Sequence, residues 1–263
     1  MARTRDVAGG GRAIEVEPER LLGWFDRFAA RHGGLIGVRG TGREVRVAAA
    51  DGASAEVVVP FGGLPRGVMA SAAPTGPGDA VEPATVGPGA EPAGPRDAVE
   101  PATGRLRVEQ PAAAVLDALH AHLAVPRRIG VVLVRLGGYS IGVAVGGIVE
   151  TSTTGARPVH GRNRKGGSSS GRFARRRDNQ ARVALDAAAD AVARFLLPVA
   201  PTLDAVVLGG DAVALDDLRA DRRLAALLAR AEPRVLDVPE PRRAVLDEAA
   251  RRALAVEIVV REP

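Results

Sequence analysis

The chain has 263 residues, of which 46% are hydrophobic and 25% charged, with a formal net charge of +5 and no cysteine. This length allows one large domain or two small ones with apolar cores. The positive charge favours an anionic partner, and a nucleic acid is a stronger candidate than a membrane surface. The absence of cysteine excludes disulfides, thiolate metal sites and a thiol nucleophile.

No apolar run approaches the roughly 20 residues of a membrane span, so we expect no membrane contact. The first residues, MARTRDVAGGGR, lack the apolar core of a secretory signal. We therefore expect a cytoplasmic protein.

Residues 1–64 predict a small α+β domain. PERLLGWFDRFAARHGG, residues 18–34, has apolar residues at helical spacing and then two glycines that favour a helix end. Three short segments follow and predict a meander of strands. These segments are LIGVRG (35–40), REVRVAAA (43–50) and AEVVVP (55–60).

Residues 65–104 are rich in proline and glycine and contain DAVEPAT twice, at 79–85 and 97–103. A segment of this composition buries too little apolar surface to offset the entropy of ordering it. We interpret it as a disordered insert or linker. Residues 105–125 then include AAAVLDALHAHLAV, which predicts a helix that completes the first domain.

Residues 126–263 predict a second domain of α/β class. RRIGVVLVRLGGYSIGVAVGGIVETSTT indicates three strands joined by glycine turns. A long helix from about Phe173 to Leu197 follows, with an apolar stripe through Ala181, Ala184, Leu185, Ala188, Val192 and Phe195. The rest alternates: a strand at 203–210, a helix at 211–231, a strand at 234–239 and a helix at 241–258. This order predicts an RNase H-like mixed sheet with flanking helices, within a chain that is α+β overall.

The segment HGRNRKGGSSSGRFARRRDNQ, residues 160–180, concentrates positive charge around a Gly–Ser run with one acid, Asp178. Its cations are Arg162, Arg164, Lys165, Arg172, Arg175, Arg176 and Arg177. The last four fall in the first turns of the long helix, where the helix dipole makes each cation cost a few tenths of a kcal/mol or more. Four cations at a helix end where the dipole disfavours positive charge suggest that these arginines serve a function. Arginine guanidinium groups and backbone N–H groups are suited to binding RNA phosphates. The alternative interpretation of this segment is a solvated arginine-rich surface without a partner.

Other chemistries fit less well. GYSIG, residues 138–142, matches the nucleophile elbow of hydrolases, but no histidine follows His160 to complete a triad, so we expect Ser140 to be a hairpin residue. The segments VVLVRL and SIGVAVGGIV carry no acid for a two-metal nuclease. We predict neither a metal nor a cofactor.

Four segments together resemble the release-factor middle-domain superfamily, specifically the actinobacterial Vms-like release factors, a family of peptidyl-tRNA hydrolases. They are PVHGRNRKGG, GRFARRRDNQAR, GGYSIGV and VVLGGD. The similarity covers about 126–263, and the amino-terminal helix more loosely. It implies an RNase H-like core whose glycine-rich loop enters the peptidyl-transferase centre of the large ribosomal subunit. There a loop glutamine promotes attack of water on the ester that joins peptide to tRNA.

The resemblance also implies roles for particular residues. Gly166 and Gly167 would let the loop enter a narrow RNA channel. The family's glutamine position falls on Ser170, or on Ser169 if the loop is one residue shorter. The seven cations named above would contact ribosomal or transfer RNA, so the implied partners are the large ribosomal subunit, ribosomal RNA and peptidyl-tRNA.

The function so implied is a ribosome-associated peptidyl-tRNA hydrolase that releases nascent peptide from stalled large subunits. The chain has only two glutamines, Gln110 and Gln180, and neither lies in the loop. An alternative is therefore a catalytically inactive ribosome- or RNA-binding factor of the same fold. A third class is a protein that binds free tRNA.

Overall fold

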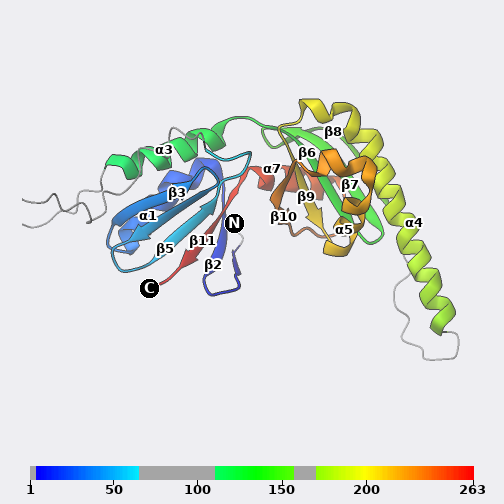
Figure 1. Ribbon diagram of the computed structural model, residues 1–263, viewed down its shortest axis with the longest axis horizontal. Coiled ribbons are helices and arrows are strands. Elements are labelled where there is room, and N and C mark those ends of the chain that lie inside the picture. Colours follow the sequence, from blue (N-terminus) through cyan, green and yellow to red (C-terminus); the bar gives the residue numbers. More distant parts are fainter. Residues whose placement is uncertain (1–3, 65–109, 157–169) are drawn as a thin grey trace, which may run out of the picture.

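The computed structural model describes residues 4–64, 110–156 and 170–263, which form two sheets with their helices. Figure 1 shows the two units side by side, with α3 (Gln110–Ala124) and the chain that follows it running from one to the other. The insert expected at 65–104 lies outside the described residues. No helix in the described ranges is long and apolar enough to cross a membrane.

The first sheet has six strands in the order β1-β2-β11-β5-β4-β3, and every neighbouring pair is antiparallel. The strands are β1 (Thr4–Asp6), β2 (Arg12–Val16), β3 (Leu35–Thr41), β4 (Glu44–Ala49), β5 (Ser54–Val58) and β11 (Val256–Arg261). α1 (Leu21–Arg31) and α3 share one buried cluster with the strands, and Pro18 of the short η1 (Pro18–Arg20) is buried just before α1. Val45 and Val47 of β4 alternate with more exposed residues, as expected of a sheet with one covered face.

The carboxyl-terminal strand corrects the sequence analysis. The last helix, expected at 241–258, ends at Leu254, and β11 begins at Val256. Ile258 lies opposite Ile14 of β2 and Val57 of β5, so the end of the chain completes the first sheet. The burial of β11 alternates along the strand, which is the strand period and not the helical one.

The second sheet has five strands in the order β10-β9-β6-β7-β8. They are β6 (Arg128–Arg135), β7 (Gly138–Val145), β8 (Ile148–Ala156), β9 (Ala205–Gly210) and β10 (Ala231–Leu236). The first three form an antiparallel meander, β9 runs parallel to β6, and β10 runs parallel to β9. This mixed sheet, with its flanking helices, confirms the α/β class that the sequence predicts.

Helices cover both faces of the second sheet. α4 (Ser170–Leu196) and α5 (Ala212–Ala220) pack on the face that carries Val132 and Val134 of β6. α7 (Arg243–Leu254) packs on the face that carries Val131 and Leu133. β6 is thus buried on both sides, which explains why its sequence is a continuous apolar run.

Several element limits differ from the prediction. The helix expected at 211–231 is divided into α5, η4 (Arg222–Leu224) and α6 (Ala225–Leu228). The division falls at Asp221, whose backbone is extended and whose carboxylate accepts a hydrogen bond from the Arg223 N–H at 2.9 Å. β10 begins three residues before the expected strand at 234, α4 begins at Ser170, and η3 (Leu197–Thr202) follows it. β1 and β2 were not predicted.

A mostly buried ion-pair cluster joins the two sheets. Glu15 of β2 accepts hydrogen bonds from Arg252 of α7, from Nε at 3.0 Å and from Nη2 at 2.6 Å. Arg234 of β10 adds an ion pair to the same carboxylate at 2.7 Å. Because Arg252 is only 8% exposed, the charges of this junction are held by each other rather than by water.

A second contact between the units surrounds Phe61. The Phe61 N–H donates to the Glu232 carboxylate of β10 at 3.0 Å, and burial raises the pKa of Glu232. The Arg127 guanidinium lies 5.7 Å from the centre of the Phe61 ring. Within the first unit, His122 of α3 is hydrogen-bonded through Nε2 to the Pro60 carbonyl, next to Phe61, at 3.0 Å. Together with Glu15, these contacts fix how the two units meet.

Candidate nucleic-acid interface

One edge of the second sheet gathers the ends of four strands. Arg135 of β6 lies opposite Gly138 of β7, and Gly138 lies opposite Ala156 of β8. Val134 lies beside Gly210 at the end of β9. The chain leaves β8 at this edge towards the basic segment, and α5 begins at the same edge.

Asp211 fixes the turn at this edge. Its Oδ2 accepts a hydrogen bond from the Leu136 N–H at 2.9 Å, and its Oδ1 pairs with Arg135 Nη2 at 2.9 Å. Gly210 precedes it with φ of 120°, and a Cβ there would overlap the Val134 carbonyl oxygen. The VVLGGD motif thus serves as a rigid support at the edge, and Asp211 is already occupied by structural bonds.

The GGYSIGV motif forms the hairpin next to it. Gly137 makes the turn with φ of 100°, and Gly155 of β8 leaves room for the Tyr139 ring, since a Cβ there would overlap it. Ser140 is fully buried, and its hydroxyl lies 2.8 Å from the Thr154 hydroxyl across the sheet. β7 continues past Ser140 to Val145 without a helix, so the expectation that Ser140 is a hairpin residue is confirmed and the nucleophile elbow is not formed.

α4 reaches well beyond the part of it that packs on the sheet. Its 27 residues span about 40 Å. The buried residues include Ala184, Leu185, Ala188 and Val192, which confirms the expected stripe. Ala181 and Phe195 lie half-buried at its margins, and Leu196 is the last buried residue of the helix. Figure 1 shows the amino-terminal turns of α4 extending past the sheet as an arm.

The predicted site residues divide into two groups. Ser170 is the first residue of α4, and Arg172, Arg175, Arg176 and Arg177 occupy its first two turns. The fold therefore brings Ser170 and these four arginines to one end of the arm. The other predicted site residues lie outside the described ranges: Arg162, Arg164, Lys165, Gly166, Gly167 and Ser169.

The end of the arm can attract an anion. The first N–H groups of an α-helix have no acceptor within the helix, and the helix dipole places partial positive charge there. The sequence adds four arginines and one acid, Asp178, to these turns. Among the described residues, no group of three or more His, Asp or Glu side chains could hold a metal ion.

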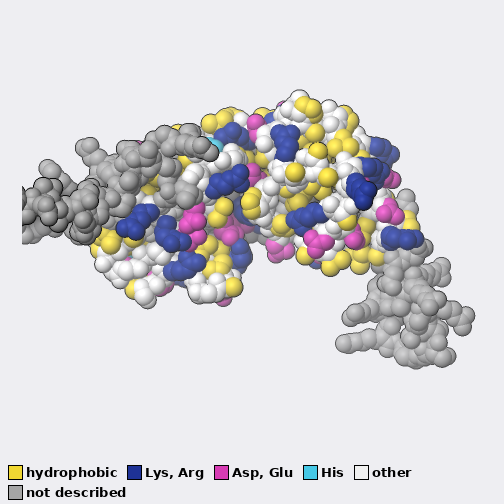
Figure 2. All heavy atoms as spheres, viewed as in Figure 1, with side chains coloured by type: hydrophobic (Ala, Val, Ile, Leu, Met, Phe, Trp, Pro, Cys, Tyr) yellow, Lys and Arg dark blue, Asp and Glu magenta, His cyan; other side chains and the backbone are white. Residues whose placement is uncertain are grey.

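Arginines elsewhere in the described ranges are often paired with carboxylates. Arg223 is one example, lying 2.6 Å from Asp221 and 2.8 Å from Asp190. Figure 2 shows basic and acidic side chains close together on the visible face of both units. The pair of Arg223 with Asp190 and that of Arg135 with Asp211 could not be predicted from the sequence, because these partners lie far apart in the chain.

A family model described as Actinobacteria/chloroflexi VLRF1 release factor matches residues 127–259. The matched range begins just before β6, contains the basic segment and α4, and ends within β11. No curated protein matches the chain.

Proposed function

The chain belongs to the Actinobacteria/chloroflexi VLRF1 release factor family, and from this premise we propose that it is a ribosome-associated peptidyl-tRNA hydrolase acting in the cytoplasm. It releases nascent peptide from tRNA on stalled large ribosomal subunits. The observation that carries the proposal is α4, whose amino-terminal turns extend past the sheet and hold four arginines beside Ser170.

The arm is the part of the protein that binds RNA. Arg172, Arg175, Arg176 and Arg177 contact phosphates of ribosomal RNA or peptidyl-tRNA, helped by Arg162, Arg164 and Lys165 of the preceding segment. Contacts of this kind release counterions, so binding weakens as salt rises. The rigid edge around Asp211 and the packed half of α4 provide the fixed base from which the arm reaches into the subunit.

The chemistry is hydrolysis of the ester between peptide and tRNA. A water oxygen attacks the ester carbonyl carbon, the bond to the tRNA ribose oxygen breaks, and the proton lost by water goes to that oxygen. The hydroxyl of Ser170, or of Ser169, orients the water. A backbone N–H at the start of α4 stabilises the developing oxyanion, while Gly166 and Gly167 allow the close approach to RNA.

Two substitutions at Ser170 test this chemistry. Ser170→Gln places the family's residue at the aligned position and should raise the rate of peptide release from peptidyl-tRNA on isolated large subunits. Ser170→Ala removes the hydroxyl and should lower the rate about tenfold or more. The same two substitutions at Ser169 test the alternative alignment, in which the loop is one residue shorter. If none of the four variants changes the rate, the proposed roles of Ser169 and Ser170 are wrong.

A second candidate function is a ribosome- or RNA-binding factor without hydrolysis. The absence of a loop glutamine favours this candidate, because the only two glutamines in the chain, Gln110 and Gln180, lie outside the loop. Gln180 lies ten residues along α4 from Ser170, which is about 15 Å of helix. Sedimentation with large subunits without peptide release would select this candidate. Binding to free tRNA without sedimentation with subunits would select a tRNA-binding protein instead.

A further inference from the structure

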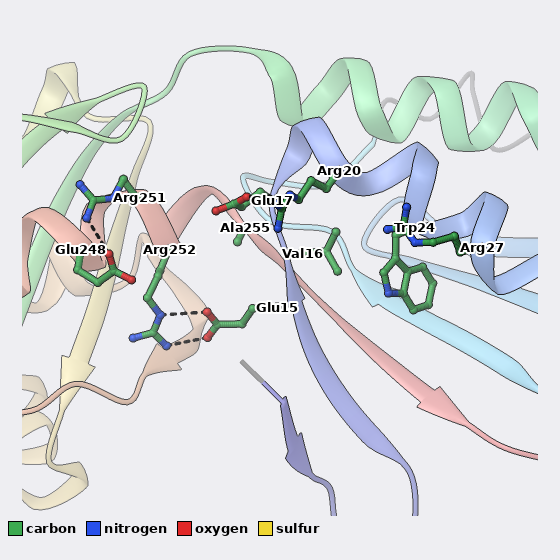
Figure 3. A pocket seen from close by; sticks show the side chains of 10 residues that line it. All are labelled: Glu15, Val16, Glu17, Arg20, Trp24, Arg27, Glu248, Arg251, Arg252 and Ala255. Carbon is green, nitrogen blue, oxygen red and sulfur yellow. Dashed lines mark hydrogen bonds and ion pairs between the residues drawn. The ribbon is translucent and has the colours of Figure 1, made fainter. Parts of the chain in front are cut away.

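A cleft of about 320 Å³ lies where the two units meet, away from the arm. One wall comes from the segment β2, η1 and α1, and the other from α7 (Figure 3). The bidentate contact of Arg252 with Glu15 holds the walls together at the cleft. The volume suits a small ligand of about the size of a nucleotide.

The guanidinium groups that line the cleft are not equally engaged. Arg252 is bound to Glu15, and Arg251 pairs with Glu248 at 2.7 Å. Arg20 lies 3.6 Å from Glu17 in an exposed and therefore weak pair. Arg27 is exposed and makes no hydrogen bond or ion pair with any residue in the described ranges. Arg20 and Arg27 are thus the cations available to an anionic ligand.

Trp24 of α1 lies between Arg20 of η1 and Arg27 of α1 in the sequence and lines the same cleft. Its ring is stacked on Phe28, with centroids 5.4 Å apart and an angle of 11° between the planes, and it meets Phe25 edge-on at 5.1 Å. These contacts hold the indole in place, while the half-buried side chain leaves part of the ring open to the cleft. A fixed aromatic surface loses little freedom when a flat ligand stacks on it.

We propose that this cleft binds an unpaired nucleotide of single-stranded RNA, with the base against Trp24 and the adjoining phosphates at Arg20 and Arg27. Stacking on an aromatic ring next to guanidinium groups is how proteins hold unpaired bases. An acidic peptide would satisfy the arginines but offers no ring for Trp24. The site lies outside the peptide-release machinery and does not depend on the proposed hydrolysis.

Trp24 is the only tryptophan in the chain, so its fluorescence reports on the cleft directly. The full chain is titrated with an unstructured RNA of about eight nucleotides. We expect a saturable change in fluorescence that double-stranded RNA of equal length does not produce. Arg27→Gln and Arg20→Gln should each weaken the apparent affinity about tenfold. The matched control Arg242→Gln removes an exposed arginine that pairs with Glu240 outside the cleft, and should leave the titration unchanged.

Three results would overturn the inference: no fluorescence change, an equal change with inorganic phosphate alone, or an unchanged affinity in the Arg27 variant. The arm is tested separately in the same assay. Replacing Arg175, Arg176 and Arg177 by Ala should leave the Trp24 signal intact, whereas Arg27→Gln should leave peptide release intact. Failure of the cleft is therefore distinguishable from failure of the release function.

Discussion

The junction between the two sheets and the amino-terminal end of α4 both use arginine, but in opposite ways. At the junction, Arg252 and Arg234 surround the carboxylate of Glu15 and are largely removed from water. At the end of α4, four arginines share two helical turns with a single acid, Asp178, at a place where the helix dipole disfavours cations. The number of arginines in a region of this chain therefore says little about the function of that region. The acids within reach of each arginine decide whether it serves the fold or a partner.

The largest effect should come from removing the shared acid of the junction. Glu15→Gln leaves the buried guanidinium of Arg252 without a charged partner, and we expect the free energy of unfolding to fall by about 3 kcal/mol. Denaturant unfolding of both proteins measures the difference. Glu240→Gln, which removes the partner of exposed Arg242, is the control and should change little. A loss below about 1 kcal/mol for the Glu15 variant would mean that the junction is not held by these charges.

Substitutions in the arm should lower the affinity for RNA and leave the stability of the fold unchanged or slightly raised. Replacing Arg175, Arg176 and Arg177 by Ala should lower the affinity for large-subunit RNA about ten- to a hundredfold and flatten its salt dependence. Stability should stay the same or rise slightly, because three cations leave the positive end of a helix dipole. A control with Arg5, Arg219 and Arg242 replaced by Ala removes the same net charge from exposed surface pairs. If both triple variants lose equal affinity, the effect is general charge and not the arm.

The pH dependence of stability sharpens the junction further. Burial pushes the pKa of Glu15 upward, but the hydrogen bond from Arg252 and the charges of Arg234 and Arg252 outweigh it, so the net pKa is lowered. A carboxylate with a lowered pKa stabilises the fold above its ordinary value of 4.5, and this contribution is lost as the pH falls through the folded-state value. Unfolding free energies measured from pH 7 to pH 3 should fall more steeply for the wild type than for Glu15→Gln. Parallel curves would contradict the assignment.

The smallest effect is expected on the more exposed face of the first sheet. Glu56 of β5 accepts hydrogen bonds from Arg46 at 2.9 Å and from Arg261 at 3.0 Å, and both arginines are well exposed to solvent. Glu56→Gln should therefore cost only about 0.5 kcal/mol in denaturant unfolding. If it costs as much as Glu15→Gln, burial does not distinguish the two clusters.

The second sheet could be predicted from the sequence because its signals are local. β6 and β9 are continuous apolar runs, glycines mark the turns, and the packed part of α4 has helical spacing from Ala184 onward. The arginines at the start of α4 were predicted for the same reason, since their departure from the dipole rule is visible within a few residues.

The first sheet was predicted only in part because its partners lie at opposite ends of the chain. β11 follows α7 directly, and its pairing with β2 joins residues more than 200 positions apart, such as Ile258 and Ile14. Glu15 interrupts the apolar pattern of β2. Its carboxylate accepts a hydrogen bond from Arg252, a partner that no local sequence pattern reveals. The cleft beside Trp24 was missed in the same way, since α1 forms one wall and α7 the other.

The rate of peptide release from peptidyl-tRNA on isolated large ribosomal subunits is the most direct test. The full chain should release peptide faster than buffer, and the variant with Arg175, Arg176 and Arg177 replaced by Ala should lose most of this rate while remaining folded. A rate equal to that of buffer, measured while the full chain still sediments with the subunits, would contradict the proposed hydrolysis.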